Sequence, residues 1–223
     1  CPTGASMPSK EIGKVIPDKK VDSVCPYCGV GCLLTYNIKD DKILFAEGRD
    51  GPANMSRLCV KGRYGFNYVN SEQRLTVPLA RKEGVTKNIQ PEDFNLDRIE
   101  DYFEPISWED AIERTAEKFK SLTDQDVKST AGFGCAKGSN EEAYLFQKLI
   151  RTGFKNNNVD HCTRLCHASS VVALLEMIGS GAVSNQVADV AEADTIIVIG
   201  ANPTVNHPVA ATFIKNAAKA GKN

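Results

Sequence analysis

Apolar positions change their spacing about one third of the way along the chain. Between Val21 and Pro78 they come in short stretches, such as residues 33–36 and 42–45, separated by Gly and Asp. Short apolar stretches between turn residues predict short strands. Residues 21–78 are therefore expected to form a small β-rich domain.

Beyond residue 105 the pattern alternates between helices and strands. Ser107 is a good N-cap for a helix with Ala111, Ile112 and Phe119 on one face. Residues 193–200 form an apolar run that predicts a buried parallel strand. The other expected elements are a strand near 129–133, a turn over 134–140, a helix over 141–154, a turn over 156–167, and helices over 168–178 and 207–220.

This order of elements predicts an α/β fold, or α+β overall: the small β-rich domain, then an incomplete doubly wound α/β domain over residues 79–223. A strand and helix normally lead into another parallel strand, so we expect a fragment of a longer protein. Residues 1–20 predict a linker, and Cys1 before Pro2 is typical of the last cysteine of an upstream ferredoxin-like module. The acidic segment 81–105 is expected to be a solvated insertion in preference to a cation site.

Composition and charge exclude several classes of protein. The 223 residues are 42% hydrophobic and 25% charged, which is typical of a folded chain. No apolar run approaches the roughly 20 residues of a membrane span, and no secretory leader is visible, so we expect a soluble, cytoplasmic protein. Lys and Arg number 27 against 28 Asp and Glu, without blocks of one sign, so nucleic acid is not an expected partner.

Eight cysteines, five of them within the first 59 residues, indicate metal ligation more than a disulfide framework. The motif Cys-Pro-Tyr-Cys-Gly-Val-Gly-Cys holds Cys25, Cys28 and Cys32, and Cys59 follows later. Three close thiolates plus a distant one favour a [4Fe-4S] cluster, while a structural zinc ion or disulfides remain alternatives. Lys61 follows Cys59 by two residues, where it could help set the cluster potential and bridge to a second cofactor, or be a solvated surface residue.

A second group of candidate ligands occupies residues 159–167, which include His161, Cys162, Cys166 and His167. One zinc site made of all four is awkward, because adjacent residues point apart, and a Cys–His nucleophile pair meets the same objection. Cys166 precedes the predicted helix 168–178, whose N-terminus favours a thiolate that a soft metal would bind. His167 is suited to move a proton near neutral pH; the alternative is a buried inert cysteine beside a packing histidine.

The loop over residues 200–208 follows the predicted apolar strand and precedes a helix. That position suits nucleotide phosphates and ribose, but the loop lacks Gly-x-Gly-x-x-Gly, so an ordinary nicotinamide site gains no support. Gly132, Gly134 and Gly138 are better explained by a plain strand-to-helix turn.

Taken in order, these motifs resemble the molybdenum- or tungsten-containing bis(pyranopterin guanine dinucleotide) oxidoreductases, and among them the formate dehydrogenase catalytic subunit. The likeness covers residues 21–223 and rests on four motifs. They are the cysteine motif at 25–32, Leu-Cys-Val-Lys-Gly-Arg-Tyr-Gly at 58–65, residues 158–160 with 164–167, and Gly-Ala-Asn-Pro at 200–203 with His-Pro at 207–208. It implies a [4Fe-4S] cluster on the four cysteines and Mo or W on Cys166, a position that is selenocysteine in some relatives. It also implies that Lys61 lies between cluster and pterin, that His167 is catalytic, and that the dinucleotide contacts come from Arg164, Gly200, Asn202 and Asn206.

The resemblance implies oxidation of formate to CO2 and the reverse reduction, with two electrons leaving through the cluster. It implies as partners the rest of the same chain and electron-transfer subunits of iron–sulfur, flavin/NAD or hydrogenase type. The fragment alone is expected to be inactive. Two alternatives remain: a nitrate reductase of the same superfamily, and a non-catalytic iron–sulfur electron-transfer module. In the nitrate reductases Met usually follows the cysteine, so His167 is evidence against the first alternative.

Overall fold

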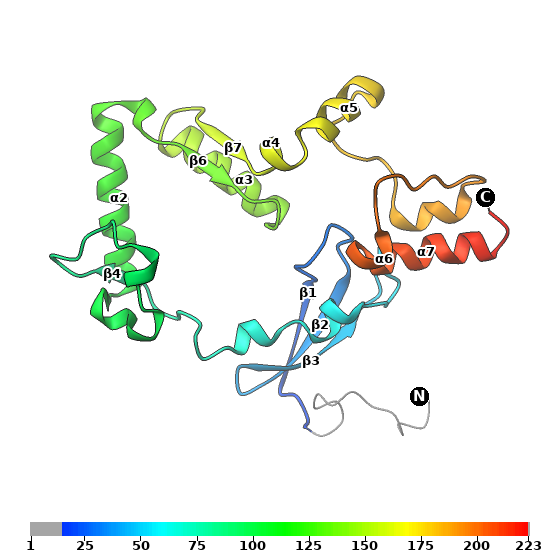
Figure 1. Ribbon diagram of the computed structural model, residues 1–223, viewed down its shortest axis with the longest axis horizontal. Helices are drawn as coiled ribbons and strands as arrows, with labels where there is room; N and C mark the ends of the chain where they lie inside the picture. The colour runs from blue at the N-terminus through cyan, green and yellow to red at the C-terminus, as the bar shows by residue number, and fades with distance from the viewer. Residues whose placement is uncertain (1–14, 223) are drawn as a thin grey trace. The chain divides into compact units, whose positions relative to one another are not determined.

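The computed structural model describes residues 15–222, and it divides the chain into two compact units (Figure 1). Of the described residues, one unit combines 15–74 with 169–222, and the other is Leu75–Ala168. The expected ferredoxin-like tail at Cys1 lies outside the described residues. Within the described residues, no helix has the length and apolar character needed to cross a membrane.

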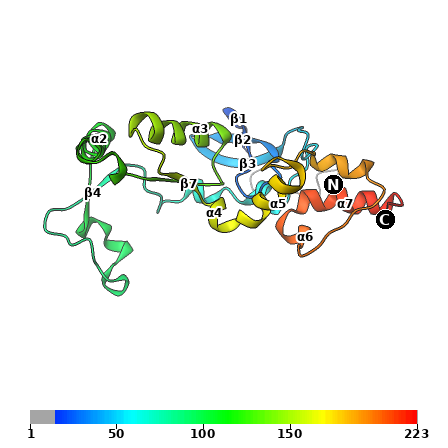
Figure 2. The same ribbon diagram turned by 90° about the horizontal axis from the view of Figure 1, so that it is seen from above.

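The first unit is built on a three-stranded antiparallel sheet, whose strands lie side by side in Figures 1 and 2. β2 and β3 are joined by Asp40 and Asp41, which both have positive φ, at 48° and 57°. Two positive φ angles are what a tight type I′ hairpin turn requires. The predicted β-rich unit is confirmed, with the strands β1 (Lys19–Val24), β2 (Leu33–Lys39) and β3 (Lys42–Gly48).

The last helix of the described chain packs onto this unit. In α7 the buried residues Val209, Phe213 and Ala217 recur every four residues, as on one helix face, and Ala211 is buried as well. Val209 and Phe213 share one apolar core with the residues between β1 and β2. The prediction of a helix over 207–220 is confirmed. The helical elements assigned to this part are α1 (Val60–Tyr64), η1 (Asn67–Asn70), α5 (Ala168–Ile178), η6 (Val187–Glu192), α6 (Pro203–Asn206) and α7 (Pro208–Lys219).

The second unit contains the predicted alternation of helices and strands. The Ser107 hydroxyl accepts the Asp110 N–H at 3.0 Å, so Ser107 caps α2 as predicted. β6 and β7 pair in parallel, and the helix between them begins at a capping box made by Ser139 and Glu142. The elements are β4 (Leu79–Arg81), η2 (Pro91–Asp93), η3 (Leu96–Asp101), β5 (Phe103–Pro105), α2 (Trp108–Gln125), η4 (Val127–Ser129), β6 (Gly132–Gly134), α3 (Asn140–Lys148), the π-helical η5 (Leu149–Gly153), β7 (Val159–His161) and α4 (Thr163–Cys166).

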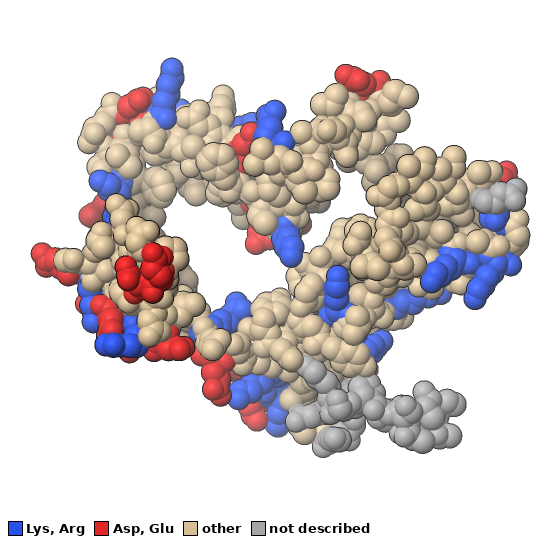
Figure 3. Space-filling model, in the orientation of Figure 1, with Lys and Arg blue, Asp and Glu red and all other residues tan. Residues whose placement is uncertain are grey.

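The acidic segment around β4 and β5 also carries basic side chains. On the face shown in Figure 3, both signs of charge are mixed over this segment. Arg98 forms an ion pair with Asp101 at 2.7 Å, and both side chains are largely exposed. Mixed, solvated charges agree with the expected insertion.

Two predicted elements differ from the structure. The predicted turn over 156–167 contains β7 and α4. The predicted strand over 193–200 is wrong. Residues 193–200 form no strand, and Ile197 and Ile199 are 76% and 84% exposed. An isolated strand leaves its backbone N–H and C=O groups unpaired, so an apolar run becomes a strand only beside a partner. Among residues 15–222 no neighbouring strand pairs with this run.

Candidate functional site

The loop between β1 and β2 brings three of the candidate thiols together. Val24 and Leu33 are the last pair of the β1–β2 ladder, so Cys25 and Cys32 face each other at its end. The Cys25 N–H donates to the Cys32 carbonyl at 2.8 Å. Gly31 has φ of 68°, a left-handed conformation that suits glycine and lets the loop fold back before Cys32.

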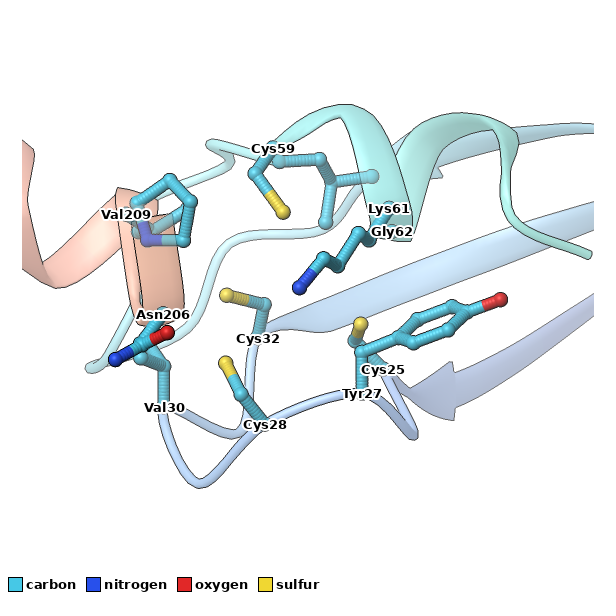
Figure 4. A pocket seen from close by; sticks show the side chains of 12 residues that line it. Cys25, Tyr27, Cys28, Val30, Cys32, Cys59, Lys61, Gly62, Asn206 and Val209 are labelled. Atoms are coloured by element: carbon cyan, nitrogen blue, oxygen red, sulfur yellow. The ribbon is translucent and has the colours of Figure 1, made fainter. Parts of the chain in front are cut away.

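The fourth thiol comes from a different segment and lines the same pocket. Cys59 immediately precedes α1, which carries Lys61. The Tyr27 hydroxyl donates a short hydrogen bond to the carbonyl of Gly65 and so joins α1 to the cysteine loop. Figure 4 shows the four sulfur atoms and the Lys61 ammonium group turned toward the same space. The pocket is lined by Cys25, Tyr27, Cys28, Val30, Cys32, Leu58, Cys59, Lys61, Gly62, Asn206, Pro208 and Val209.

Burial and mutual repulsion raise the pKa of two of these thiols, Cys25 and Cys32, so a cationic partner favours their ionisation. Burial, the largest cause, together with repulsion from the nearby Cys25, Cys28 and Cys59, raises the pKa of Cys32 to about 11. Burial is also the main cause of the raised pKa of Cys25. Iron binding removes this cost because it neutralises the thiolates. The donor set therefore fits a thiolate-bound metal cluster.

A buried asparagine supports the end of the cysteine loop through hydrogen bonds to the backbone. Asn54 is fully buried, and its Oδ1 accepts the Leu33 N–H at 3.0 Å. Its Nδ2 lies 3.0–3.1 Å from three carbonyl oxygens, those of Leu33, Arg49 and Arg57. Because Leu33 follows Cys32 directly, this one side chain fixes the backbone that carries a candidate ligand.

The second group of candidates, residues 159–167, belongs to the other unit. The Arg164 Nε donates to Asp160 at 3.1 Å, and the His161 N–H donates to the same carboxylate at 2.8 Å. These two contacts, the backbone one first, lower the pKa of Asp160. Cys166 is the last residue of α4, and His167 lies between it and Ala168, where α5 begins. Both side chains are exposed. The predicted start of the helix over 168–178 is confirmed.

The three candidates of the 200–208 loop are separated by the structure. Asn206, at the end of α6, lines the cysteine pocket. Gly200 and Asn202 are exposed and do not line it, and the Asn202 Oδ1 accepts the Thr204 hydroxyl at 2.5 Å.

Comparison with known families gives both parts of the chain the same assignment. The family model of the molybdopterin oxidoreductase Fe4S4 domain matches residues 18–71, and the family model of the molybdopterin oxidoreductases matches residues 74–222. The chain belongs to the molybdopterin oxidoreductase family. The two matches indicate a [4Fe-4S] cluster and a molybdopterin as cofactors of this family member. The mixed helix–strand fold agrees with that assignment.

Individual relatives of this molybdopterin oxidoreductase are named as formate dehydrogenases. The F420-dependent formate dehydrogenase 2 subunit alpha of Methanococcus maripaludis is 39% identical over 204 residues, covering 91% of this chain and 27% of that protein. The F420-dependent formate dehydrogenase subunit alpha of Methanocaldococcus jannaschii is 35% identical over 204 residues, again 91% of this chain and 27% of the relative. The chain thus spans about a quarter of the length of these curated relatives.

A solved structure supports the fold. Acetylene hydratase from Pelobacter acetylenicus superposes with a TM-score of 0.64 over 92% of this chain and 26% of the hydratase, at 18% identity. At 18% identity this likeness shows a shared fold alone.

Two structural residues of the site were not predicted from the sequence. Nothing local distinguishes Asn54 from an ordinary loop asparagine, since its two bonds to the Leu33 backbone reach a strand that is distant in the sequence. Tyr27 lies inside the cysteine motif, and only the folded position of Gly65 gives its hydroxyl a partner.

Proposed function

We propose that this molybdopterin oxidoreductase chain is part of the catalytic subunit of a molybdenum- or tungsten-dependent formate dehydrogenase. The observation that carries the proposal is the 39% identity, over 91% of this chain, to a formate dehydrogenase alpha subunit. His167, directly after Cys166, also favours a formate dehydrogenase over a nitrate reductase. In the nitrate reductases of this superfamily, Met usually follows the cysteine.

Cys25, Cys28, Cys32 and Cys59 would hold the [4Fe-4S] cluster. The four thiols share one pocket, but among residues 15–222 no three His, Cys, Asp or Glu side chains lie close enough to share one metal ion. In a [4Fe-4S] cluster each thiolate binds a different iron, whereas a zinc ion gathers its ligands at one centre about 2.3 Å away.

The second proposed cofactor is a bis(pyranopterin guanine dinucleotide) with Mo or W, which would supply the two-electron redox chemistry when bound. Cys166 would be its protein ligand, and Lys61, through its ammonium group, would lie between cluster and pterin. Arg164, Gly200, Asn202 and Asn206 are proposed as contacts of the dinucleotide.

The proposed reaction converts formate to CO2, two electrons and one proton, and runs in reverse as CO2 reduction. His167 would take up and release the proton, since an imidazole nitrogen can accept or donate one. The electrons would leave through the four-cysteine site to an electron-transfer subunit of iron–sulfur, flavin/NAD or hydrogenase type. A cytoplasmic location is part of the same proposal.

The test is formate-dependent dye reduction by the full-length holoenzyme under anaerobic conditions. Cys166→Ala should abolish the activity while iron content stays at the wild-type level. Cys135→Ser is the matched control, because this exposed cysteine has no proposed catalytic role, and it should keep the activity. Unchanged formate oxidation in the Cys166 variant would refute the proposed active site and leave an electron-transfer module.

Elemental analysis of the same preparation tests the cofactors separately. Iron together with Mo or W is expected. Zinc in place of these metals would contradict the proposal at its four-cysteine site. Nitrate-dependent oxidation of reduced dye, with no response to formate, would identify the enzyme as a nitrate reductase instead.

A further inference from the structure

Two further cysteines lie at the ends of the paired strands β6 and β7. The register pairs Gly134 with His161, the last residues of the two strands. The Cys162 N–H continues this ladder by donating to the Gly134 carbonyl at 3.3 Å. Cys135 and Cys162 are therefore the next two residues in register. Neighbouring strands run about 4.8 Å apart, within the roughly 4.4–6.8 Å that separates the Cα atoms of a disulfide.

The two sulfur atoms accept hydrogen bonds from consecutive amides of one turn. The Ala136 N–H lies 3.2 Å from the Cys162 Sγ, although these residues are far apart in sequence. The Lys137 N–H lies 3.5 Å from the Cys135 Sγ. Both side chains thus reach the same turn, so the structure brings the two thiols to one place.

Both thiols are also available for reaction. Cys135 and Cys162 are free and exposed in the structure. Neither belongs to the four-cysteine pocket, and neither is the proposed metal ligand. They are a pair of accessible, adjacent thiols without an assigned role.

We propose that Cys135 and Cys162 form a reversible dithiol–disulfide pair that small disulfides oxidise. One thiolate attacks the small disulfide, forms a mixed disulfide and releases one small thiolate. The second protein thiolate then attacks the mixed disulfide and releases the other small thiolate. The protein loses two electrons, the oxidant gains them, and the two protons pass through solvent to the released thiolates.

Closure of this bond would act on the loop that leads to the proposed metal ligand. The Cys162 carbonyl accepts the N–H groups of Leu165 and Cys166, each at 3.1 Å. A bond from Cys162 to Cys135 would therefore tie the start of α4 to the end of β6. The pair depends only on the geometry of this unit, so it does not rest on the proposed formate activity.

The sequence allows a direct test by mass spectrometry. Trypsin cleaves after Lys128, Lys137, Lys155 and Arg164, which places each cysteine alone in one peptide, 129–137 and 156–164. The full-length holoenzyme is incubated anaerobically with oxidised glutathione, blocked with N-ethylmaleimide and digested without reductant. We expect the two peptides to appear linked, two hydrogen atoms lighter than their sum, and dithiothreitol to separate them.

Single variants and wild-type protein together decide the outcome. Cys135→Ser and Cys162→Ser should each abolish the linked peptide, and the remaining cysteine should carry glutathione or the maleimide. In wild-type protein, two separately blocked or glutathionylated peptides would overturn the proposal. Two unreacted peptides, or a link from Cys162 to the peptide that contains Cys166, would overturn it as well.

Discussion

Replacing Asn54 by Ala tests whether one buried amide holds the cluster loop in place. The substitution removes the acceptor for the Leu33 N–H and the donor shared by the carbonyls of Leu33, Arg49 and Arg57. All of these contacts lie around a side chain with 0% exposure, so water does not replace them without rearrangement of the loop.

The expected cost follows from these contacts. A typical net hydrogen bond contributes about 1 kcal/mol, and a buried polar group left unpaired costs about 1–3 kcal/mol. Because the four contacts share one side chain, their costs do not add fully, and we expect a loss of roughly 3–5 kcal/mol. Native domains are stable by only about 5–15 kcal/mol, so this loss is large.

The assay is thermal bleaching of the cluster absorption in anaerobic full-length protein. Asn70→Ala is the matched control, because Asn70 uses the same amide to bond both backbone groups of Ile43, at 3.3 and 3.0 Å, and is only partly buried. Its expected cost is about 1–2 kcal/mol. The Asn54 variant should therefore bleach at a clearly lower temperature. Equal bleaching temperatures for the two variants would refute the reasoning.

Three further substitutions have defined outcomes. Cys28→Ala should remove the broad cluster absorption near about 400 nm, measured on anaerobic protein. Gly132→Ala should destabilise the second unit by about 1–3 kcal/mol in urea unfolding, because the added Cβ would lie 2.7 Å from the buried Ile150 side chain. Tyr27→Phe should cost about 0.5–1.5 kcal/mol in cluster bleaching, because it removes the hydrogen bond to the Gly65 carbonyl.

Each of these variants has a control in the same chain. Cys135→Ser should keep the full absorption, and retained absorption in the Cys28 variant would point to another cluster site. In Gly153→Ala the new Cβ meets only the end of the Leu149 side chain, at 3.2 Å, so its unfolding should change little. Tyr68→Phe alters a half-exposed ring, and a shift equal to that of the Tyr27 variant would contradict the role of the Gly65 bond.

Local signals in the sequence predicted the helices and the cysteine cluster well. Ser107 caps its helix, and the helix at 168–178 has the predicted bounds, because caps and apolar spacing act within a few residues. The spacing of Cys25, Cys28 and Cys32 is equally local. The run 193–200 failed because its strand state depends on a partner strand, which no local pattern supplies. Asn54 was missed for the same reason, since its burial is a tertiary property.

The residues that line the four-cysteine pocket are synthesised at different times, because they come from both ends of the described chain. All four pocket thiols precede residue 60, whereas Pro208 and Val209 complete the pocket wall. At about 5–20 residues per second, a ribosome needs roughly 8–30 s to pass from Cys59 to Val209. During that interval the nascent chain presents the four thiols of the proposed cluster site while the last wall of their pocket has not yet been synthesised.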